Sequence, residues 1–261
     1  MSKDNSIKEF LFSSKKKIKS SLSLVSRKFN RLFLSDKLSE SESYNVPIII
    51  NNRNRYTYLL QLVTWLENNN YTNIIILDND STFPKLLEYY KITKHRVVFL
   101  KANVGYMALW QTPVFNEVKN GFYVYTDPDV IPNTNCPSNV VFKLYTVLSK
   151  YGNIEKAGAA LLISDLPNHY KNKDSVIKDE SLYWLKKINE NVFDAPVDTT
   201  FALYKPQAFG NSEQCKAYRL GGDYSFHHLP WYEDSLNPTI ENKFYIDNIK
   251  HGTTVWSEKN K

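Results

Sequence analysis

Glycine, cysteine and long apolar runs are all scarce in this sequence. Eight glycines in 261 residues, without an internal period, argue against repeats and low complexity. The two cysteines, Cys136 and Cys215, form neither a CxxC pair nor a disulfide framework, which favours a reducing compartment. No segment approaches the roughly 20 apolar residues that a membrane-spanning helix needs. We therefore expect a soluble or peripheral protein without a secretory signal peptide.

The net charge of +6 is concentrated at one end of the chain. Residues 1–35 contain nine Lys/Arg and two Asp/Glu, a balance of +7, so about −1 remains for residues 36–261. The main body is not basic, and no nucleic-acid partner is expected. In residues 13–33, apolar side chains recur near helical spacing among lysines and arginines, which is typical of a helix lying on an anionic membrane surface. A solvated tail that packs on the body explains the same pattern equally well.

Strand and helix patterns alternate from residue 46 onward with short connections. Short apolar runs predict buried strands, and apolar residues spaced three and four apart predict helices. The expected strands are 46–52, 73–80, 96–100, 121–126, 156–163 and 197–204. The expected helices are 55–70, 83–90, 105–115, 138–152, 180–188 and 237–252. This order predicts an α/β sandwich with a mainly parallel central sheet and a less regular second half.

Two carboxylates follow directly after the expected strand 121–126. Asp127 and Asp129 flank Pro128 in "FYVYTDPD". Unpaired charges are not expected inside a buried strand, so their position calls for an explanation. Two carboxylates on alternate residues at a strand end can share one hard divalent cation, Mg²⁺ or Mn²⁺, that keeps coordination positions open for phosphate oxygens. The alternative is an ordinary Asp-Pro turn with a helix-capping aspartate.

Polar side chains also follow the other strands, at the edge where parallel sheets collect ligands. Asp78 can accept hydrogen bonds from a nucleobase N–H or from ribose hydroxyls, whereas Asp80 fits a turn or a helix cap better. Arg55 can contact a phosphate or a ribose. Asn103 and Gly105 predict a tight turn in which the backbone approaches a ligand. Turn and capping roles remain open for all of these residues.

The segment 218–234, together with Asp198 earlier in the chain, contains several side chains suited to catalysis or metal binding. His228, folded back over the carboxylate pair, can complete a metal site as a neutral imidazole. Asp198 can deprotonate or orient an acceptor hydroxyl, and Glu233 and Asp234 compete for the role of base. A hydrogen-bonded structural histidine and turn-capping carboxylates are the alternatives.

Taken in order, "IIINNRNR", "IIILDNDST", "KANVGYMALWQ" and "VYTDPDVIP" resemble the pattern of GT-A glycosyltransferases of the family 2 kind. The similarity covers roughly residues 46–135. The second half, with "PVDTTFALY" and "HHLPWY", resembles small sugar-transferring enzymes of bacterial surface polysaccharide synthesis. The sequence departs from the family in having Asp-Asn-Asp-Ser where Asp-Asp or Asp-Gly-Ser is usual, and the position of the base is left open.

The resemblance implies a GT-A-like three-layer sandwich that transfers a sugar from a nucleotide-diphosphate sugar, with Mn²⁺ or Mg²⁺, to a hydroxyl acceptor. It places the metal on Asp127 and Asp129, with His228 as a third ligand. Asp198, Glu233 and Asp234 are the candidates for the base of an inverting displacement. The implied donor-binding set is Asn54, Arg55, Asp78, Asp80, Asn103, Gly105 and Asp127.

The implied organisation is a basic segment (1–35), a linker (36–45), a nucleotide-sugar-binding half (46–135) and an acceptor-binding half of the same domain (136–261). A glycan or glycolipid acceptor built on a lipid carrier would place the protein in the cytoplasm, peripheral on the inner face of the cell membrane. A non-catalytic sugar-nucleotide-binding module is the alternative. A nucleotidyltransferase is disfavoured because "NNRNRYTYL" lacks the glycine of a triphosphate-binding loop.

Overall fold

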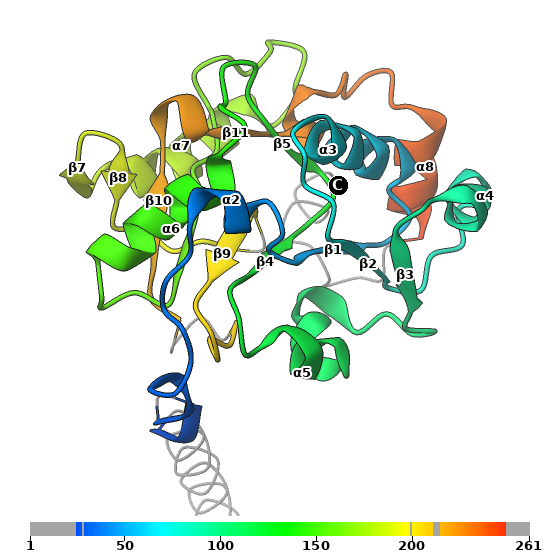
Figure 1. Cartoon of the computed structure of the whole chain (residues 1–261). Helices are drawn as coiled ribbons and strands as arrows, with labels where there is room; N and C mark the ends of the chain where they lie inside the picture. The colour runs from blue at the N-terminus through cyan, green and yellow to red at the C-terminus, as the bar shows by residue number, and fades with distance from the viewer. Residues whose placement is uncertain (1–24, 28, 199, 211–214, 249–261) are drawn as a thin grey trace, which may run out of the picture.

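The computed structural model of the protein describes residues 25–27, 29–198, 200–210 and 215–248 (Figure 1). Within these residues, a nine-stranded mixed sheet has the order β3-β2-β1-β4-β9-β6-β10-β8-β7. β9 and β8 run antiparallel to both of their neighbours, and the other strands share one direction. The predicted α/β class with a mainly parallel sheet is therefore confirmed.

The elements have the following bounds. The sheet consists of β1 (Ile48–Asn52), β2 (Ile74–Asp78), β3 (Arg96–Phe99), β4 (Tyr123–Thr126), β6 (Lys156–Ala159), β7 (Lys187–Asn189), β8 (Val192–Phe193), β9 (Ala202–Tyr204) and β10 (Ala217–Leu220). A separate ribbon pairs β5 (Val130–Pro132) with β11 (Phe226–His228). The α-helices are α2 (Glu40–Ser43), α3 (Tyr56–Asn68), α4 (Pro84–Ile92), α5 (Val114–Val118), α6 (Val140–Lys150), α7 (Lys173–Ser181) and α8 (Ile240–Asp247). Single-turn helices are η1 (Gly105–Met107), η2 (Leu109–Gln111), η3 (Leu182–Trp184), η4 (Gly222–Tyr224) and η5 (Leu229–Tyr232).

The central strands are covered on both faces, which makes the molecule three-layered. All positions of β1 and β2 are buried, as expected for parallel strands between helices. Because side chains alternate along a strand, Ile48 and Ile50 join the core beneath α3, whereas Ile49 joins the core that contains Leu109 of η2. Figure 1 shows α3 and α6 on one side of the sheet and α5 on the other. Each fully buried side chain of this kind stabilises the fold by about 1.5–3 kcal/mol.

The helix predicted for 180–188 is present over residues 180–184, as the end of α7 and the turn η3, and is wrong beyond Trp184. α7 ends at Ser181, η3 adds one turn, and Lys187–Asn189 forms the edge strand β7. The apolar side chains that suggested a helix face, Leu182 and Leu185, are largely exposed, at 62% and 73%. Pairing of β7 with β8 at the sheet edge overrides the local helical pattern.

Two further segments differ from the prediction. Residues 105–115 form η1, η2 and the start of α5 in place of one helix, because Gly105 has φ +76° and Pro113 lacks an amide N–H. The expected linker 36–45 contains α2, whose capping box joins Ser39 and Glu42. The Ser-x-x-Glu pattern of that box was the signal that the sequence offered.

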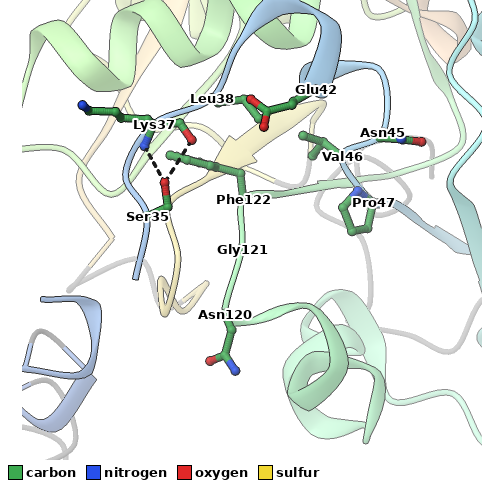
Figure 2. A pocket seen from close by; sticks show the side chains of 10 residues that line it. All are labelled: Ser35, Lys37, Leu38, Glu42, Asn45, Val46, Pro47, Asn120, Gly121 and Phe122. Atoms are coloured by element: carbon green, nitrogen blue, oxygen red, sulfur yellow. Dashed lines mark hydrogen bonds between the residues drawn. The ribbon is translucent and has the colours of Figure 1, made fainter. Parts of the chain in front are cut away.

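A pocket lies at the edge of the sheet opposite to the aspartates. Figure 2 shows that side chains from two segments line it. Ser35, Lys37, Leu38, Glu42, Asn45, Val46 and Pro47 precede β1 in the chain, and Asn120, Gly121 and Phe122 precede β4. It therefore sits at the amino ends of these strands, whereas Asp127 follows the carboxyl end of β4. The pocket does not belong to the site described below.

The structure leaves no room for a side chain at Gly158 of β6. A Cβ atom there would lie 2.5 Å from Cγ1 of Val197 and 3.1 Å from Cβ of Ala202. We expect Gly158→Ala to lower the free energy of unfolding by about 1–3 kcal/mol through overpacking, as measured by urea denaturation. Gly121→Ala is the control, because no atom lies within 4 Å of its Cβ position. Equal losses in the two variants would contradict the packing explanation.

Candidate functional site

The carboxyl ends of β1 and β4 flank the point at which the strand order reverses. The chain runs outward from β1 through β2 and β3, and then returns to the other side of β1 as β4. Loops diverge at such a point, and open α/β sheets bind their ligands in the resulting crevice. Asp127 and Asp129 follow β4 here, and Arg55 follows β1.

Asp129 and His228 face each other across the ribbon of β5 and β11. His228 pairs with Val130, and its Nε2 lies 3.6 Å from Oδ2 of Asp129. Both side chains are 19% exposed, and Asp127 is half-buried beside them. Burial lowers the pKa of His228, because it disfavours the imidazolium form more than the carboxylate of Asp129 supports it. The imidazole is therefore neutral at pH 7.

The chemistry of these donors fits a divalent cation. A neutral imidazole has one ring nitrogen with a free lone pair, and Nε2 is the nitrogen on the side of Asp129. Carboxylate oxygens are the ligands that Mn²⁺ and Mg²⁺ prefer. Within the described ranges, no three His, Cys, Asp or Glu side chains are arranged to hold an ion by themselves. Asp129 and His228 of the predicted set lie together, and the metal site formed with Asp127 stays a prediction.

Asp78 is buried and fully engaged within the protein. Its Oδ1 accepts a hydrogen bond from the Tyr90 hydroxyl at 3.1 Å, and its Oδ2 accepts one from the Ser81 backbone N–H at 3.2 Å. Burial raises the pKa of this carboxyl, although both hydrogen bonds oppose the shift. The structure therefore supplies the hydrogen-bond donors for the turn role of Asp78, one of the two roles that the sequence left open.

Asn54 has a structural role where the sequence suggested a ligand contact. Its side chain is fully buried, and its Oδ1 accepts hydrogen bonds from the backbone N–H groups of Thr82 and Phe83 at 2.7 and 3.0 Å. These groups open α4, so Asn54 caps that helix from another part of the chain. Asn54 thus has a structural role of its own, and its place in the donor-binding set stays a prediction.

The remaining donor-side candidates lie in turns beside the strand ends. Asp80 is half-buried and has φ +67°, the left-handed conformation of a turn. Oδ1 of Asn103 accepts a hydrogen bond from the Gly105 N–H at 3.1 Å, and Gly105 has φ +76°. The carbonyl of Gly105 accepts a hydrogen bond from the side chain of Asn79, which follows β2. The tight turn expected here is present and is tied to the ligand edge of the sheet.

The three candidate bases differ in their surroundings. Asp234 is occupied in a turn, accepting hydrogen bonds from the Leu236 N–H and the Asn237 side chain. Glu233 is half-buried and accepts hydrogen bonds from the side chains of Tyr58 and Asn242. Burial raises the pKa of Glu233, which strengthens it as a base.

Asp198 is the third candidate and is exposed to solvent. It precedes β9, whose first residue Ala202 pairs with Tyr125 of β4, so it lies at the same edge of the sheet as Asp127. The geometry thus favours Asp198 and Glu233 over Asp234.

Sequence reasoning missed the residues that α8 adds to the site. Nη1 of Arg55 donates a hydrogen bond to Oδ1 of Asn242 at 3.1 Å, and the Arg55 guanidinium lies 3.5 Å from the centre of the Tyr245 ring. Glu241 accepts hydrogen bonds from the N–H and the hydroxyl of Thr57 in the first turn of α3. These contacts join residues far apart in the sequence, so no local sequence pattern predicts them.

The capping role of Asn54 leads to a stability prediction. We expect Asn54→Ala to lower the free energy of unfolding by about 1–2 kcal/mol more than Asn70→Ala, because only Asn54 caps a helix with its side chain, whereas Asn70 ends α3 through its backbone. Both residues have positive φ, 56° and 66°, so the control carries the same backbone cost. Chemical denaturation of the two variants measures the difference. Equal destabilisation would show that the cap contributes nothing.

Comparison with known proteins gives structural neighbours only. No protein-family model matches the sequence, and no curated protein matches it. Similar solved structures include GalNAc-T7 with UDP, GalNAc and Mn²⁺, at TM-score 0.46 and 12% identity over 70% of this chain and 43% of that chain. Glucosyl-3-phosphoglycerate synthase from Mycobacterium tuberculosis, with Mn²⁺ and UDP-glucose, has TM-score 0.39 and 13% identity over 66% of this chain and 61% of that chain. The chain thus spans less than two thirds of either protein, and at these values the likeness assigns it neither an activity nor a ligand.

Proposed function

We propose that the protein is a metal-dependent glycosyltransferase that moves a sugar from a nucleotide-diphosphate sugar to a hydroxyl acceptor. The observation that supports the proposal is the 3.6 Å approach of Asp129 and His228 where the strand order reverses, with Asp127 two residues before Asp129. The sequence resemblance to GT-A glycosyltransferases points to the same class. A divalent ion bound there would supply positive charge to the departing diphosphate.

The chain's own residues divide the remaining work. Asp127 and Asp129 would hold the ion, with His228 as a third ligand. Arg55 follows β1, which pairs in parallel with β4, and would add a positive charge at the same edge of the sheet. Asp198 or Glu233 takes the proton of the acceptor hydroxyl while that oxygen bonds to the sugar carbon and the bond to the diphosphate breaks. This is an inverting displacement.

The proposal includes an acceptor of the glycan or glycolipid type in bacterial surface polysaccharide synthesis, reached from the inner face of the cell membrane. Within the described residues, no helix is long and apolar enough to cross a bilayer. Most of the basic segment, residues 1–24 and 28, lies outside the described residues. In the described part, Arg31 pairs with Glu155 and Arg27 lies over the Phe209 ring. The large apolar side chains there are exposed by 59–77%, namely Val25, Phe29, Leu32 and Phe33.

These exposed side chains lead to a membrane-binding prediction. We expect the triple variant Phe29→Ser, Leu32→Ser, Phe33→Ser to bind vesicles that contain anionic phosphatidylglycerol at least about tenfold more weakly, because each apolar side chain inserted into a bilayer contributes about 1.5–3 kcal/mol. Co-sedimentation measures the binding. Ile92→Ser, which changes an equally exposed apolar residue on α4, is the control. Unchanged binding of the triple variant would contradict membrane docking by this segment.

The enzyme proposal is tested by a screen of nucleotide sugars for metal-dependent turnover. UDP-glucose and UDP-GalNAc with Mn²⁺ or Mg²⁺ are the first probes, since similar structures were solved with UDP-glucose and with UDP and GalNAc. We expect slow release of nucleoside diphosphate that stops with EDTA and resumes with added metal. Binding without turnover of any nucleotide sugar would favour a non-catalytic binding module. If the protein neither binds nor turns over any nucleotide sugar, both functions are refuted.

A further inference from the structure

The helix α8 lies against the donor side of the proposed site. Its residues reach the loop after β1 and the first turn of α3, through Asn248 to Arg53, Asn242 to Arg55, and Glu241 to Thr57. In Figure 1, α8 stands beside α3 and α4 at the top of the sheet. Tyr245 of α8 covers the guanidinium of Arg55, which belongs to the proposed donor-binding set.

The contacts that hold α8 are mostly polar. Its only buried residue is Glu241, a carboxylate, and Ile240 and Ile246 are exposed by 83% and 48%. One aromatic contact, between Phe244 and Phe83 at 5.1 Å, adds an apolar anchor. A helix that buries so little apolar surface is among the elements that open at low cost. α8 is therefore suited to leave its position.

Glu241 occupies an anion-binding position. The first turn of α3 contains no acidic residue, and its N-cap Arg55 makes no capping hydrogen bond with its side chain. The carboxylate of Glu241 accepts hydrogen bonds there from the Thr57 N–H at 2.9 Å and from the Thr57 hydroxyl at 2.7 Å. The amino end of a thirteen-residue helix favours any anion at this point, a phosphate as much as a carboxylate.

Arg55 supplies a second, independent sign of a ligand. Arg55 is only 6% exposed, and its Nε has no hydrogen-bond partner among the described residues. Buried guanidinium N–H groups without partners are costly, and a ligand with oxygen acceptors would satisfy them. The flat face of the same guanidinium is covered by the Tyr245 ring at 3.5 Å, as a nucleobase would cover it.

We propose that α8 is an internal occupant of the nucleotide subsite. Glu241 takes the place of an anionic group of the nucleotide and Tyr245 the place of its base, one helical turn apart on the same face of α8. Nucleotide binding therefore displaces α8, and the protein without nucleotide holds itself closed. The inference rests on the proposed function, because it takes the ligand to be a nucleoside diphosphate or its sugar ester.

Nucleotide affinity of α8 variants tests the competition. UDP and GDP, each with Mn²⁺, are titrated into the full-length protein and into Glu241→Gln, Tyr245→Ala and the double variant. We expect the variants to bind the preferred nucleotide about five- to tenfold more tightly, because less of the protein is in the closed form. Lys243→Ala, on the exposed face of α8, and Tyr245→Phe, which keeps the ring, should bind as the unaltered protein does.

Hydrogen exchange of the unaltered protein provides a second measurement that needs no variant. We expect amides of α8 to exchange faster when the preferred nucleotide and Mn²⁺ are present. Slower exchange would show that α8 closes over the nucleotide as part of its site, and would overturn the proposal. Equal nucleotide affinity in all variants would overturn it while leaving the glycosyltransferase proposal intact. If neither the unaltered protein nor any variant binds a nucleotide, this proposal and the glycosyltransferase proposal are both refuted.

Discussion

Replacing Asp129 by alanine is expected to lower metal-dependent release of nucleoside diphosphate by about 1,000-fold. The carboxylate faces His228 at 3.6 Å where the strand order reverses, so its loss removes one of the two proposed anionic ligands and leaves Asp127 with the imidazole. A bound metal contributes several kcal/mol to stabilising a departing phosphate, and about 1.4 kcal/mol corresponds to a tenfold change in rate. The initial rate of UDP or GDP release, measured at saturating Mn²⁺, gives the comparison.

The controls for this variant separate metal binding from folding. Asp174→Ala changes an exposed carboxylate on α7 and should keep the rate of the unaltered protein. Asp127→Ala should lose activity as Asp129→Ala does, and manganese bound to the protein, measured by its electron paramagnetic resonance signal, should fall in both. A fully active Asp129→Ala protein would remove the basis of the proposed function.

Breaking the buried ion pair between Arg219 and Glu180 should cause the largest loss of stability. Arg219 of β10 and Glu180 of α7 are 4% and 7% exposed, and Nε of Arg219 also donates a hydrogen bond to the Pro196 carbonyl at 2.7 Å. Glu180→Ala leaves a buried guanidinium without its counter-charge, so we expect the free energy of unfolding to fall by about 3–5 kcal/mol. Guanidinium chloride denaturation measures the loss.

Two controls frame the ion-pair prediction. The double variant Glu180→Leu, Arg219→Met removes both charges and should recover most of the stability, because apolar side chains of similar size can replace a buried ion pair. Glu88→Ala breaks the exposed pair with Lys91 and should cost less than about 1 kcal/mol. If Glu180→Ala and Glu88→Ala cost the same, burial is not what makes the Arg219 pair important.

The first half of the fold could be predicted because its signals are local. The isoleucine runs of β1 and β2 predict buried strands, and the spacing of Leu59, Val63 and Leu66 predicts one helix face. The carboxylate pair was recognisable for a related reason, because charge directly after a buried strand is unusual. Its position beside His228 agrees with the expectation, although the binding role of these residues remains a prediction.

The parts that were missed depend on contacts between distant segments. Asn54 gave no sign of capping α4, because the N–H groups that it satisfies belong to Thr82 and Phe83. The edge strand β7 forms only because β8 is there to pair with it. The helix predicted over 237–252 is present as α8 within the described residues, but its amphipathic pattern does not say that Glu241 will reach the first turn of α3.

The reversed direction of β9 has a consequence for how the two halves of the site meet. In a fully parallel sheet, the loop entering a strand lies at the edge away from the ligand. β9 runs antiparallel to both β4 and β6, so its entry loop, which carries Asp198, emerges beside the exit of β4, which carries Asp127. One inverted strand thus brings a potential proton acceptor and a potential ion ligand to the same rim, across a rigid ladder of hydrogen bonds.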